Sequence, residues 1–172
     1  MTTIRNTNDI SSYQLLCKML DKFKEWGCAI YIGFNSIEFD EEFLRNSFFQ
    51  NLQNPYYTQI NGNQRADALN IARASSVFYP TSLKILDVKK QFSLENLAKA
   101  NNIDHSNAHD AMADVETTID ICRIIKKKAP ELWIRSLETS SKNDVSNYVQ
   151  DRDILCHHEA YYGKVYTFVT TH

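Results

Sequence analysis

Apolar residues in the first part of the chain follow a helical and then an extended pattern. From Ser11 to Glu25 they return every three or four positions, as one buried face of an amphipathic helix requires. Gly27 is placed to end this helix. The run from Cys28 to Ile32 is short, apolar and rich in β-forming residues. It therefore predicts a strand that is buried on both faces, as parallel strands are.

Three shorter helices are predicted further along the chain. The first runs from Asp40 to about Leu52 and has acidic residues in its first turn, where the helix dipole favours them. The second follows Asp67, a good N-cap residue, and ends ahead of the next proline. The third is Leu94 to Asn101. Between the second and the third, the segment from Leu83 to Val88 is predicted as a strand.

The longest predicted helix runs from Ala108 to about Lys128. Its most apolar stripe is predicted to face the core and consists of Met112, Val115, Ile119 and Cys122. An adjoining stripe consists of Asp114, Thr118, Ile121 and Ile125. Asp114 is therefore expected at the border of the core.

The pattern changes in the last third of the chain. After Pro130 the apolar periodicity decays, and residues 136–153 are rich in Ser, Asn and charge, which predicts a linker. Residues 154–172 alternate apolar and aromatic positions, typical of one or two strands that start a truncated following domain. The order of elements in residues 1–135 favours a three-layer α/β domain that has too few strands for a complete sheet.

Composition excludes several kinds of protein. The 172 residues are 43% hydrophobic, enough for one compact domain. The four glycines lie too far apart for a glycine-rich phosphate loop, and the four scattered cysteines suit neither a disulfide framework nor a cysteine-rich zinc module. A reducing, cytoplasmic compartment without membrane attachment is therefore expected, since no apolar stretch could cross a bilayer. The net charge of -2 neither supports nor excludes a nucleic-acid partner.

Two segments carry candidates for metal chemistry. His109 lies five residues before Asp114, so a histidine at a helix start and a carboxylate within that helix can converge on one point. Such a carboxylate can bind Mg²⁺ or Mn²⁺, and the histidine can act as a base. Asp40 follows a predicted buried strand, a frequent place for ligand-binding groups in α/β folds. Each has a structural alternative: His109 can satisfy helix donors, and Asp40 can be an ordinary first-turn acid.

Two stretches of sequence resemble a known enzyme family. They are residues 33–42, which read GFNSIEFDEE and are followed by Arg45 and Asn46, and residues 94–114, which read LENLAKANNIDHSNAHDAMAD. Both are similar to the exonuclease I family, bacterial 3′→5′ exonucleases specific for single-stranded DNA, of the histidine subtype of the DEDD superfamily. The resemblance covers about residues 11–133. It implies a ribonuclease H-like α/β exonuclease fold, incomplete here at its N-terminal strands.

What the resemblance implies is two-metal hydrolysis of a phosphodiester. In the family, four carboxylates hold two Mg²⁺ or Mn²⁺ ions about 4 Å apart. By residue matching, Asp40 and Asp114 are two of these metal ligands, and His109 is the general base for the attacking water. The implied function is degradation of single-stranded DNA to mononucleotides, in DNA repair, with a single-strand-binding protein as a partner.

The same resemblance implies contacts to single-stranded DNA. The matching positions are Arg45, Tyr56, Arg73 and Phe92, where guanidinium groups would contact phosphates and rings would stack on bases. Ser93 stands where the family usually has a basic contact, and it is also a good N-cap for the helix that follows. The two arginines also suit solvated helix positions, and the two aromatic residues also suit core positions.

The first motif of the family is absent from the chain. The family places Asp-x-Glu on its opening strand, where residues two apart face the same side. The only Asp-x-Glu here is residues 40–42, in a predicted helix, where such residues point roughly 200° apart. Three explanations compete: a fragment of a longer enzyme, which we favour, a degenerate copy, and a product that works beside a second polypeptide. The alternative function is a catalytically inactive module that binds single-stranded nucleic acid.

Overall fold

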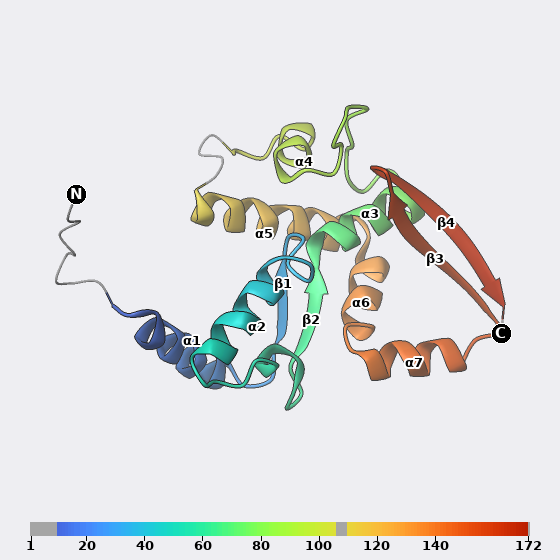
Figure 1. Ribbon diagram of the computed structural model, residues 1–172. Helices are drawn as coiled ribbons and strands as arrows, with labels where there is room; N and C mark the ends of the chain where they lie inside the picture. Colours follow the sequence, from blue (N-terminus) through green and yellow to red (C-terminus); the bar gives the residue numbers. More distant parts are fainter. Residues whose placement is uncertain (1–9, 106–109, 172) are drawn as a thin grey trace.

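The computed structural model describes residues 10–105 and 110–171. A two-stranded parallel sheet lies between two groups of helices (Figure 1). On one side of the sheet are α1 (Ser12–Trp26) and α2 (Asp40–Gln50), and on the other are α3 (Ala68–Phe78) and α5 (Ala111–Lys128). The expected three-layer α/β arrangement is therefore confirmed.

The sheet is built from β1 (Ile30–Gly33) and β2 (Gln64–Asp67), which pair in parallel over their whole lengths. The chain crosses from one strand to the other through α2 and a short 3₁₀ helix, Tyr57–Gln59. Because the strands run in the same direction, Gly33 and Asp67 lie opposite each other at the carboxyl end of the sheet. Strand β2 was not predicted, because two of its four residues are charged and it has no apolar run.

Side-chain caps fix where most of the helices begin. Ser11 starts α1 with a capping box that includes Gln14, and the side chains of Asp67 and Ser93 accept hydrogen bonds from the first turns of α3 and of α4 (Leu94–Ala100). Both predicted N-caps are confirmed. Helix α5 begins after Asp110, whose side chain accepts from Met112 N, and the predicted start at residue 108 lies outside the described residues.

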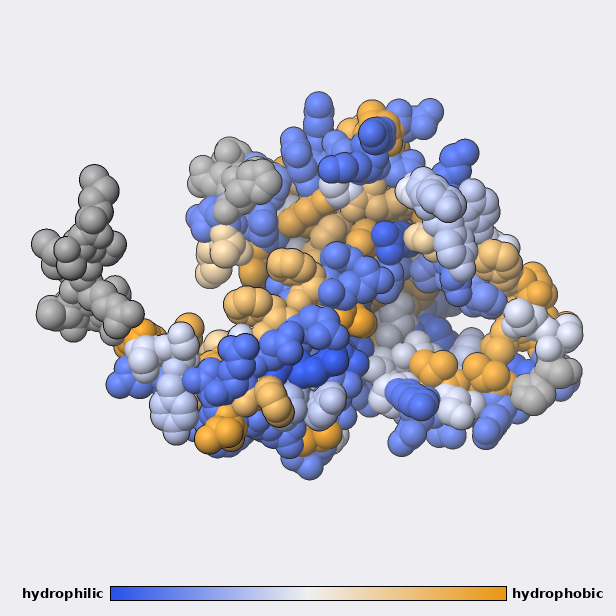
Figure 2. All heavy atoms as spheres, in the orientation of Figure 1, coloured by the Kyte–Doolittle hydropathy of each residue, from blue (hydrophilic) through white to orange (hydrophobic). Residues whose placement is uncertain are grey.

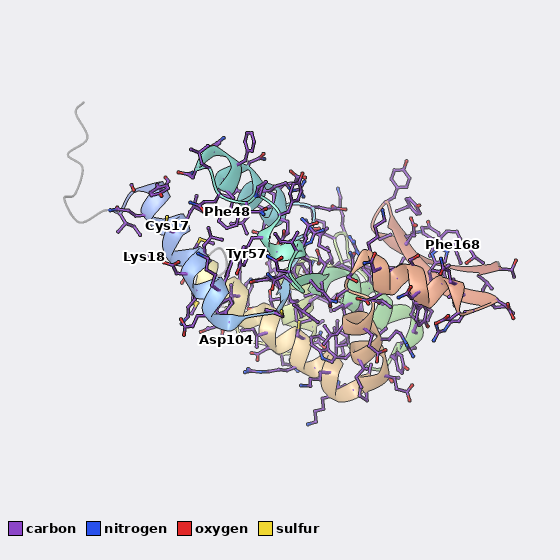
Figure 3. The ribbon with its side chains drawn as sticks, turned by 90° about the horizontal axis from the view of Figure 1, so that it is seen from below. Cys17, Lys18, Phe48, Tyr57, Asp104 and Phe168 are labelled. Atoms are coloured by element: carbon purple, nitrogen blue, oxygen red, sulfur yellow. The ribbon has the colours of Figure 1, made fainter. Side chains whose placement is uncertain are left out.

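The interior is divided into two hydrophobic clusters. The larger lies between the sheet and α3, α4 and α5 and includes the fully buried Leu97, Ile121 and Ile125. The smaller lies between α1 and α2, where Phe48 is 1% exposed and Tyr57 packs beside it (Figure 3). Each cluster therefore covers one face of the same narrow sheet.

The predicted core face of α5 is wrong. Met112, Val115 and Ile119 are 63%, 52% and 43% exposed, whereas the adjoining stripe, with Ile121 and Ile125, is buried. The sequence periodicity is that of a helix with two apolar stripes. Within the described part of the chain, only the stripe with Ile121 and Ile125 packs against other elements of the fold. Asp114, the first residue of the adjoining stripe, is half-buried, as expected for the border of the core.

Strand β1 is less buried than predicted. None of its four residues is fully buried, and Ile32 is 36% exposed. The reason is that, within the described residues, β1 has a neighbouring strand on one edge only. A parallel strand is fully buried when strands lie on both sides of it and helices cover both faces.

The predicted strand from Leu83 to Val88 is also wrong. This segment is irregular, and its backbone is paired by a side chain instead of by another strand. The Asn101 side-chain amide donates to Lys84 O at 2.9 Å, and its carbonyl accepts from Lys84 N at 3.0 Å. One asparagine at the end of α4 thus supplies both hydrogen bonds that a neighbouring strand would make.

The last part of the chain contains more structure than the sequence pattern indicated. Helices α6 (Pro130–Glu138) and α7 (Lys142–Gln150) occupy most of residues 130–153, including the predicted linker. Strands β3 (Ile154–Tyr161) and β4 (Lys164–Thr171) form an antiparallel hairpin that packs on α3 (Figure 1). The two strands agree with the predicted pair, whereas the division into domains stays a prediction. No helix within residues 10–105 and 110–171 is long and apolar enough to cross a membrane.

His158, on β3, makes the hairpin sensitive to pH. Burial lowers the pKa of His158 below its usual value, and its ring lies edge-on to Phe78 of α3, with the ring centroids 6.2 Å apart. Further influences on the pKa come from a backbone hydrogen bond at Asn70, which raises it, from Arg73 and His157, which lower it, and from Glu159, which raises it.

We expect acid to loosen the hairpin from α3. The folded-state pKa of His158 lies below the unfolded value of about 6.5, so below that pH the unfolded chain binds the proton more readily and the folded state loses stability until the pH passes the folded pKa. Hydrogen exchange of β3 and β4 should therefore be faster at about pH 5 than at about pH 7.5. His158→Gln should remove this part of the difference, and an undiminished difference in the variant would contradict the assignment.

Candidate functional site

A cavity of about 1100 Å³ opens at the carboxyl end of β1. Its walls are β1 with the loop after it, the first half of α5, and the segment that starts α4, and the turn of the hairpin at Gly163 adds to its rim. Asp40 and Asp114 both line it, as does Arg73. The structure thus brings two predicted metal ligands and one predicted phosphate contact to a single cavity.

Asp67 fixes the loop between β1 and α2, which places Asp40 at the start of α2. Its Oδ1 accepts hydrogen bonds from Asn35 N and Leu69 N, both at 2.9 Å, and its Oδ2 accepts from Ile37 N at 3.3 Å. One buried carboxylate therefore caps α3 and also ties the loop after β1 to the end of β2. Asn35 has a φ of 58°, a left-handed conformation that asparagine tolerates better than most residues.

Gly33 allows the tight turn that begins this loop. A Cβ atom at this position would lie 2.6 Å from Cβ and 2.9 Å from Oγ of Ser36. Since such contacts are too short for a side chain, the glycine is required by the close approach of Ser36. The loop then enters α2, whose first residue is Asp40.

Asp114 lies in the first turn of α5 with a partner that was not predicted. His105 Nε2 is 3.6 Å from Asp114 Oδ1, and the histidine side chain is only 9% exposed. His105 Nδ1 is 2.9 Å from Thr117 Oγ1. The single hydroxyl proton of Thr117 points to Ala113 O, which accepts it at 2.8 Å.

This pattern determines the role of each nitrogen of His105. Because the Thr117 hydroxyl donates elsewhere, His105 Nδ1 must donate to it, which leaves Nε2 to face Asp114. The 3.6 Å from Nε2 to Asp114 Oδ1 is too long for a direct hydrogen bond, so His105 packs against Asp114 from the core side.

Glu41 is a buried acid beside the same cavity. It lines the cavity and is 9% exposed. Thr58 Oγ1 donates to its Oε2 at 2.7 Å, and Arg65 Nη1 lies 3.5 Å from the same oxygen. These two partners draw its carboxylate toward β2 and the 3₁₀ helix, so Glu41 stabilises the entry of α2.

His109, the predicted general base, lies outside the described residues. Within residues 10–105 and 110–171 no group of three or more His, Cys, Asp and Glu side chains is arranged to hold a metal ion. Mg²⁺ is commonly held by one or two carboxylates together with waters and substrate phosphates. The pair Asp40 and Asp114 therefore suits the ligand chemistry of one such ion, but the described residues do not fit a site for two.

The predicted DNA contacts fall into two groups. Arg73, Phe92 and Ser93 line the cavity. Phe92 is 9% exposed and belongs to the larger core cluster, so its packing role is evident, and Ser93 is the N-cap of α4.

Arg45 and Tyr56 are not among the residues that line the cavity. Arg45 Cζ lies 5.5 Å from the ring centroid of Tyr56, and its Nη1 is 3.1 Å from Glu42 Oε1. Tyr56 is 50% exposed. The two form a cation–π pair at the surface of α2, apart from the other three predicted contacts.

Sequence reasoning missed the two residues that position the acids. Asp67 was predicted as an N-cap only, and nothing in its local sequence indicates that it also holds a loop more than thirty residues away in the chain. His105 was not singled out, because its contacts with Asp114 and Thr117 of α5 are tertiary contacts that its local sequence does not indicate. A buried polar residue at the end of a strand indicates a role in positioning a loop only when the pairing of the strands is known.

Comparison with known proteins gives a consistent result. The model of a protein family described as "Exonuclease" matches residues 2–122. Exodeoxyribonuclease I of Buchnera aphidicola (subsp. Acyrthosiphon pisum, strain APS) is 34% identical over 165 residues, which are 92% of this chain and 40% of that protein. Exodeoxyribonuclease I of Escherichia coli K12 is 41% identical over 106 residues, 59% of this chain and 22% of that protein. The chain thus spans about 40% of the length of the first relative, and less of the second.

Solved structures agree with the sequence relatives. A zinc-bound form of the E. coli ExoI–ssDNA complex is similar with a TM-score of 0.80 and 28% identity, covering 91% of this chain and 35% of that one. E. coli exonuclease I in complex with a dA16 oligonucleotide has a TM-score of 0.79 and 28% sequence identity, and the match covers 92% of this chain and 36% of that one. An ExoI/SSB-Ct complex has a TM-score of 0.75 and 25% sequence identity, and the match covers 91% of this chain and 36% of that one. These similarities confirm the expected ribonuclease H-like α/β exonuclease fold.

Proposed function

This chain belongs to the Exonuclease family, and we propose that it is the nuclease domain of a 3′→5′ exonuclease that removes mononucleotides from single-stranded DNA. The observation that carries the proposal is the meeting of Asp40, Asp114 and Arg73 in one cavity. Two carboxylates and a guanidinium group in a shared hollow suit a phosphodiester, whose charge the arginine can neutralise. The relatives named exodeoxyribonuclease I and the structure with a dA16 oligonucleotide support the same substrate.

The chain's own residues have distinct roles in this proposal. Asp40 and Asp114 are metal ligands, and His109 takes a proton from the attacking water, as a neutral imidazole can near neutral pH. Arg73 contacts a phosphate next to the scissile bond. His105 is a positioning residue, since it reaches the substrate only through Asp114.

The proposed cofactor is Mg²⁺ or Mn²⁺, two ions in the complete site. Hard divalent cations prefer oxygen ligands, which Asp40 and Asp114 supply. When bound, such ions lower the pKa of water and neutralise charge on the phosphate. The zinc-bound relative supports a divalent metal at this kind of site. Within the described residues no group of three or more His, Cys, Asp and Glu side chains is arranged to hold such an ion.

A protein partner and a cellular location are also proposed. The SSB-Ct complex of a structural relative supports the C-terminal segment of a single-strand-binding protein as a partner. A cytoplasmic location is proposed from the cysteines, which are free in the described part of the chain.

A second candidate function is a module that binds single-stranded DNA without cutting it. The incomplete ligand set within the described residues favours this candidate. It retains the exposed Tyr56 with Arg45 beside it, and Arg73 in the cavity, all suited to stacking and phosphate contact.

The first test measures binding and trimming of a 3′-labelled dA16 oligonucleotide. We expect binding that Mg²⁺ strengthens and slow release of labelled mononucleotides. Arg73→Gln should weaken binding by about 10-fold, because a phosphate contact of roughly 1–2 kcal/mol is lost. Arg123→Gln is the matched control, since Arg123 is 74% exposed on α5 and pairs with Asp120 outside the cavity. Metal-independent binding of an oligonucleotide that stays intact would instead establish the binding module.

A further inference from the structure

Lys90 is a cation that lines the cavity together with Arg73. Within residues 10–105 and 110–171, the other charged side chains that line this cavity are acids, namely Glu38, Asp40, Glu41 and Asp114. Lys90 is exposed and makes no ion pair in the described part of the chain. Its charge is therefore available to a ligand.

Both cations lie where the cavity adjoins the hairpin. Gln91, the neighbour of Lys90, donates from Nε2 to Gly163 O in the turn of the hairpin at 3.1 Å. Arg73 is on α3, on which β3 packs, and its charge lowers the pKa of His158 on β3. Figure 2 shows hydrophilic side chains over α4 and the segment that leads into it, above a hollow in which hydrophobic side chains gather. The proposed metal ligands instead come from the starts of α2 and α5.

The backbone of Lys90 is held in an unfavourable conformation. Its φ of 60° is in the left-handed region, which costs a lysine more than a glycine or an asparagine. Its carbonyl oxygen accepts from Ser93 N at 2.8 Å and from Asn96 Nδ2 at 3.1 Å, both at the start of α4. Phe92 anchors the same turn, residues 90–93, in the larger core cluster. The fold thus fixes a strained turn at the wall of the cavity, and such strain is concentrated at ligand-binding sites.

A phosphate group of a nucleic-acid strand suits these two cations. A lysine ammonium group binds phosphate as a compact point charge with three donors. Arg73 Nε is buried and has no hydrogen-bond partner among the described residues, whereas its Nη1 donates to Asn70 Oδ1 at 3.1 Å. Arg73 therefore keeps donor capacity for an anion on the wall that it shares with Lys90.

We propose that Lys90 binds a further phosphate of single-stranded DNA, on the 5′ side of the one at Arg73, so that the turn of residues 90–93 and α3 hold successive phosphates. The contact recognises charge and carries no sequence preference. It deepens the proposed function, because it rests on a single strand that enters the cavity with its 3′ end toward Asp40 and Asp114. It also requires a strand, since a mononucleotide has no phosphate at this position.

The binding test uses 5′-labelled dA16 in EDTA and fluorescence anisotropy. Lys90→Gln should weaken binding by about 5-fold at about 50 mM salt and reduce the slope of log affinity against log salt concentration by about 0.7, the effect of one phosphate contact. Lys90→Arg should bind within about twofold of the unchanged chain, since it keeps the charge. Lys89→Gln is the matched control, because Lys89 is also exposed but does not line the cavity. It should alter affinity by less than about twofold.

Two further variants separate the side chain from the strained turn. Glycine adopts a φ of 60° without strain, so Lys90→Gly should unfold at a higher urea concentration than Lys90→Ala. Both should lose the same affinity for dA16 as Lys90→Gln. Equal losses would assign the effect to the ammonium group. Full binding by Lys90→Gly would overturn the proposal.

Competition with dAMP locates the contact along the strand. The inhibition constant of dAMP against labelled dA16 should be the same for the unchanged chain and for Lys90→Gln. If that constant rose in the variant by the same factor as the dissociation constant of dA16, Lys90 would contact the terminal nucleotide, and the proposed position would be wrong.

The trimming of dA16 with Mg²⁺ separates the Lys90 contact from the proposed function. Trimming by a chain in which Lys90→Gln and Lys89→Gln bind alike would support the exonuclease and refute the Lys90 contact. A loss of binding in Lys90→Gln alone, with an oligonucleotide that stays intact, would support the contact and refute the exonuclease. Absence of dA16 binding by the unchanged chain would refute both. We expect trimming together with the selective loss.

Discussion

Asp114→Asn should reduce the release of mononucleotides by about 100-fold or more. The asparagine keeps the size of the side chain but removes the negative charge that, in the proposed role of Asp114, would hold a divalent ion. Oligonucleotide binding measured in EDTA should be unchanged or slightly tighter, because one negative charge leaves a cavity that receives phosphates. Release of labelled nucleotide from 3′-labelled dA16 and fluorescence anisotropy would measure the two effects separately.

Asp120→Asn is the matched control for this variant. Asp120 lies on the same helix, is similarly exposed, and pairs with Arg123 instead of facing the cavity. It should retain the trimming rate within about twofold, as surface substitutions usually do. If Asp114→Asn trimmed as fast as Asp120→Asn, Asp114 could not be a metal ligand, and the role of the cavity would have to be abandoned.

Asp67→Ala should destabilise the folded chain by about 2–4 kcal/mol. It removes an N-cap, which costs about 1 kcal/mol, and leaves two further backbone N–H groups in the loop without an acceptor. The loop would lose its tie to β2, so metal-dependent DNA binding through Asp40 should fall as well. Urea unfolding gives the first quantity, and titration of dA16 with and without Mg²⁺ gives the second.

Two variants bracket this effect. Ser11→Ala removes the N-cap of α1 without touching a loop, so it should cost about 1 kcal/mol and leave DNA binding unchanged. Asp67→Asn keeps one carbonyl acceptor and should lie between the two in stability. A loss in Asp67→Ala no larger than in Ser11→Ala would show that the hydrogen bonds from Asn35 and Ile37 contribute little.

Helices α1 to α5 could be predicted from the sequence because their signals are local, whereas α6 and α7 were not predicted. The caps at Asp67 and Ser93 and the apolar periodicity of α1 each act within a few residues, so they survive any tertiary context. Strand β2 and the irregular Leu83–Val88 segment could not be predicted. Whether each segment forms a strand depends on hydrogen bonds to residues outside its local sequence: Ala29 for β2, and Asn101 for the Leu83–Val88 segment.

The candidate site shows the same division between local and distant information. Asp40 and Asp114 were singled out by their places at the starts of two helices and then by a family resemblance, and the structure adds that both line one cavity. The ties through Asp67 and His105 join segments that are distant in sequence or packed across a helix. The face of α5 was predicted wrongly for a physical reason: periodicity identifies apolar stripes, but it does not say which of them has a partner.

The separation of the interior into two hydrophobic clusters affects how the protein unfolds. Within residues 10–105 and 110–171, the α1–α2 cluster and the α3–α5 cluster are separated by a sheet of two four-residue strands, so their melting is expected to be weakly coupled. Heat or denaturant should open the smaller cluster first, as a separate cooperative unit, and calorimetry should give a van't Hoff enthalpy below the total heat absorbed.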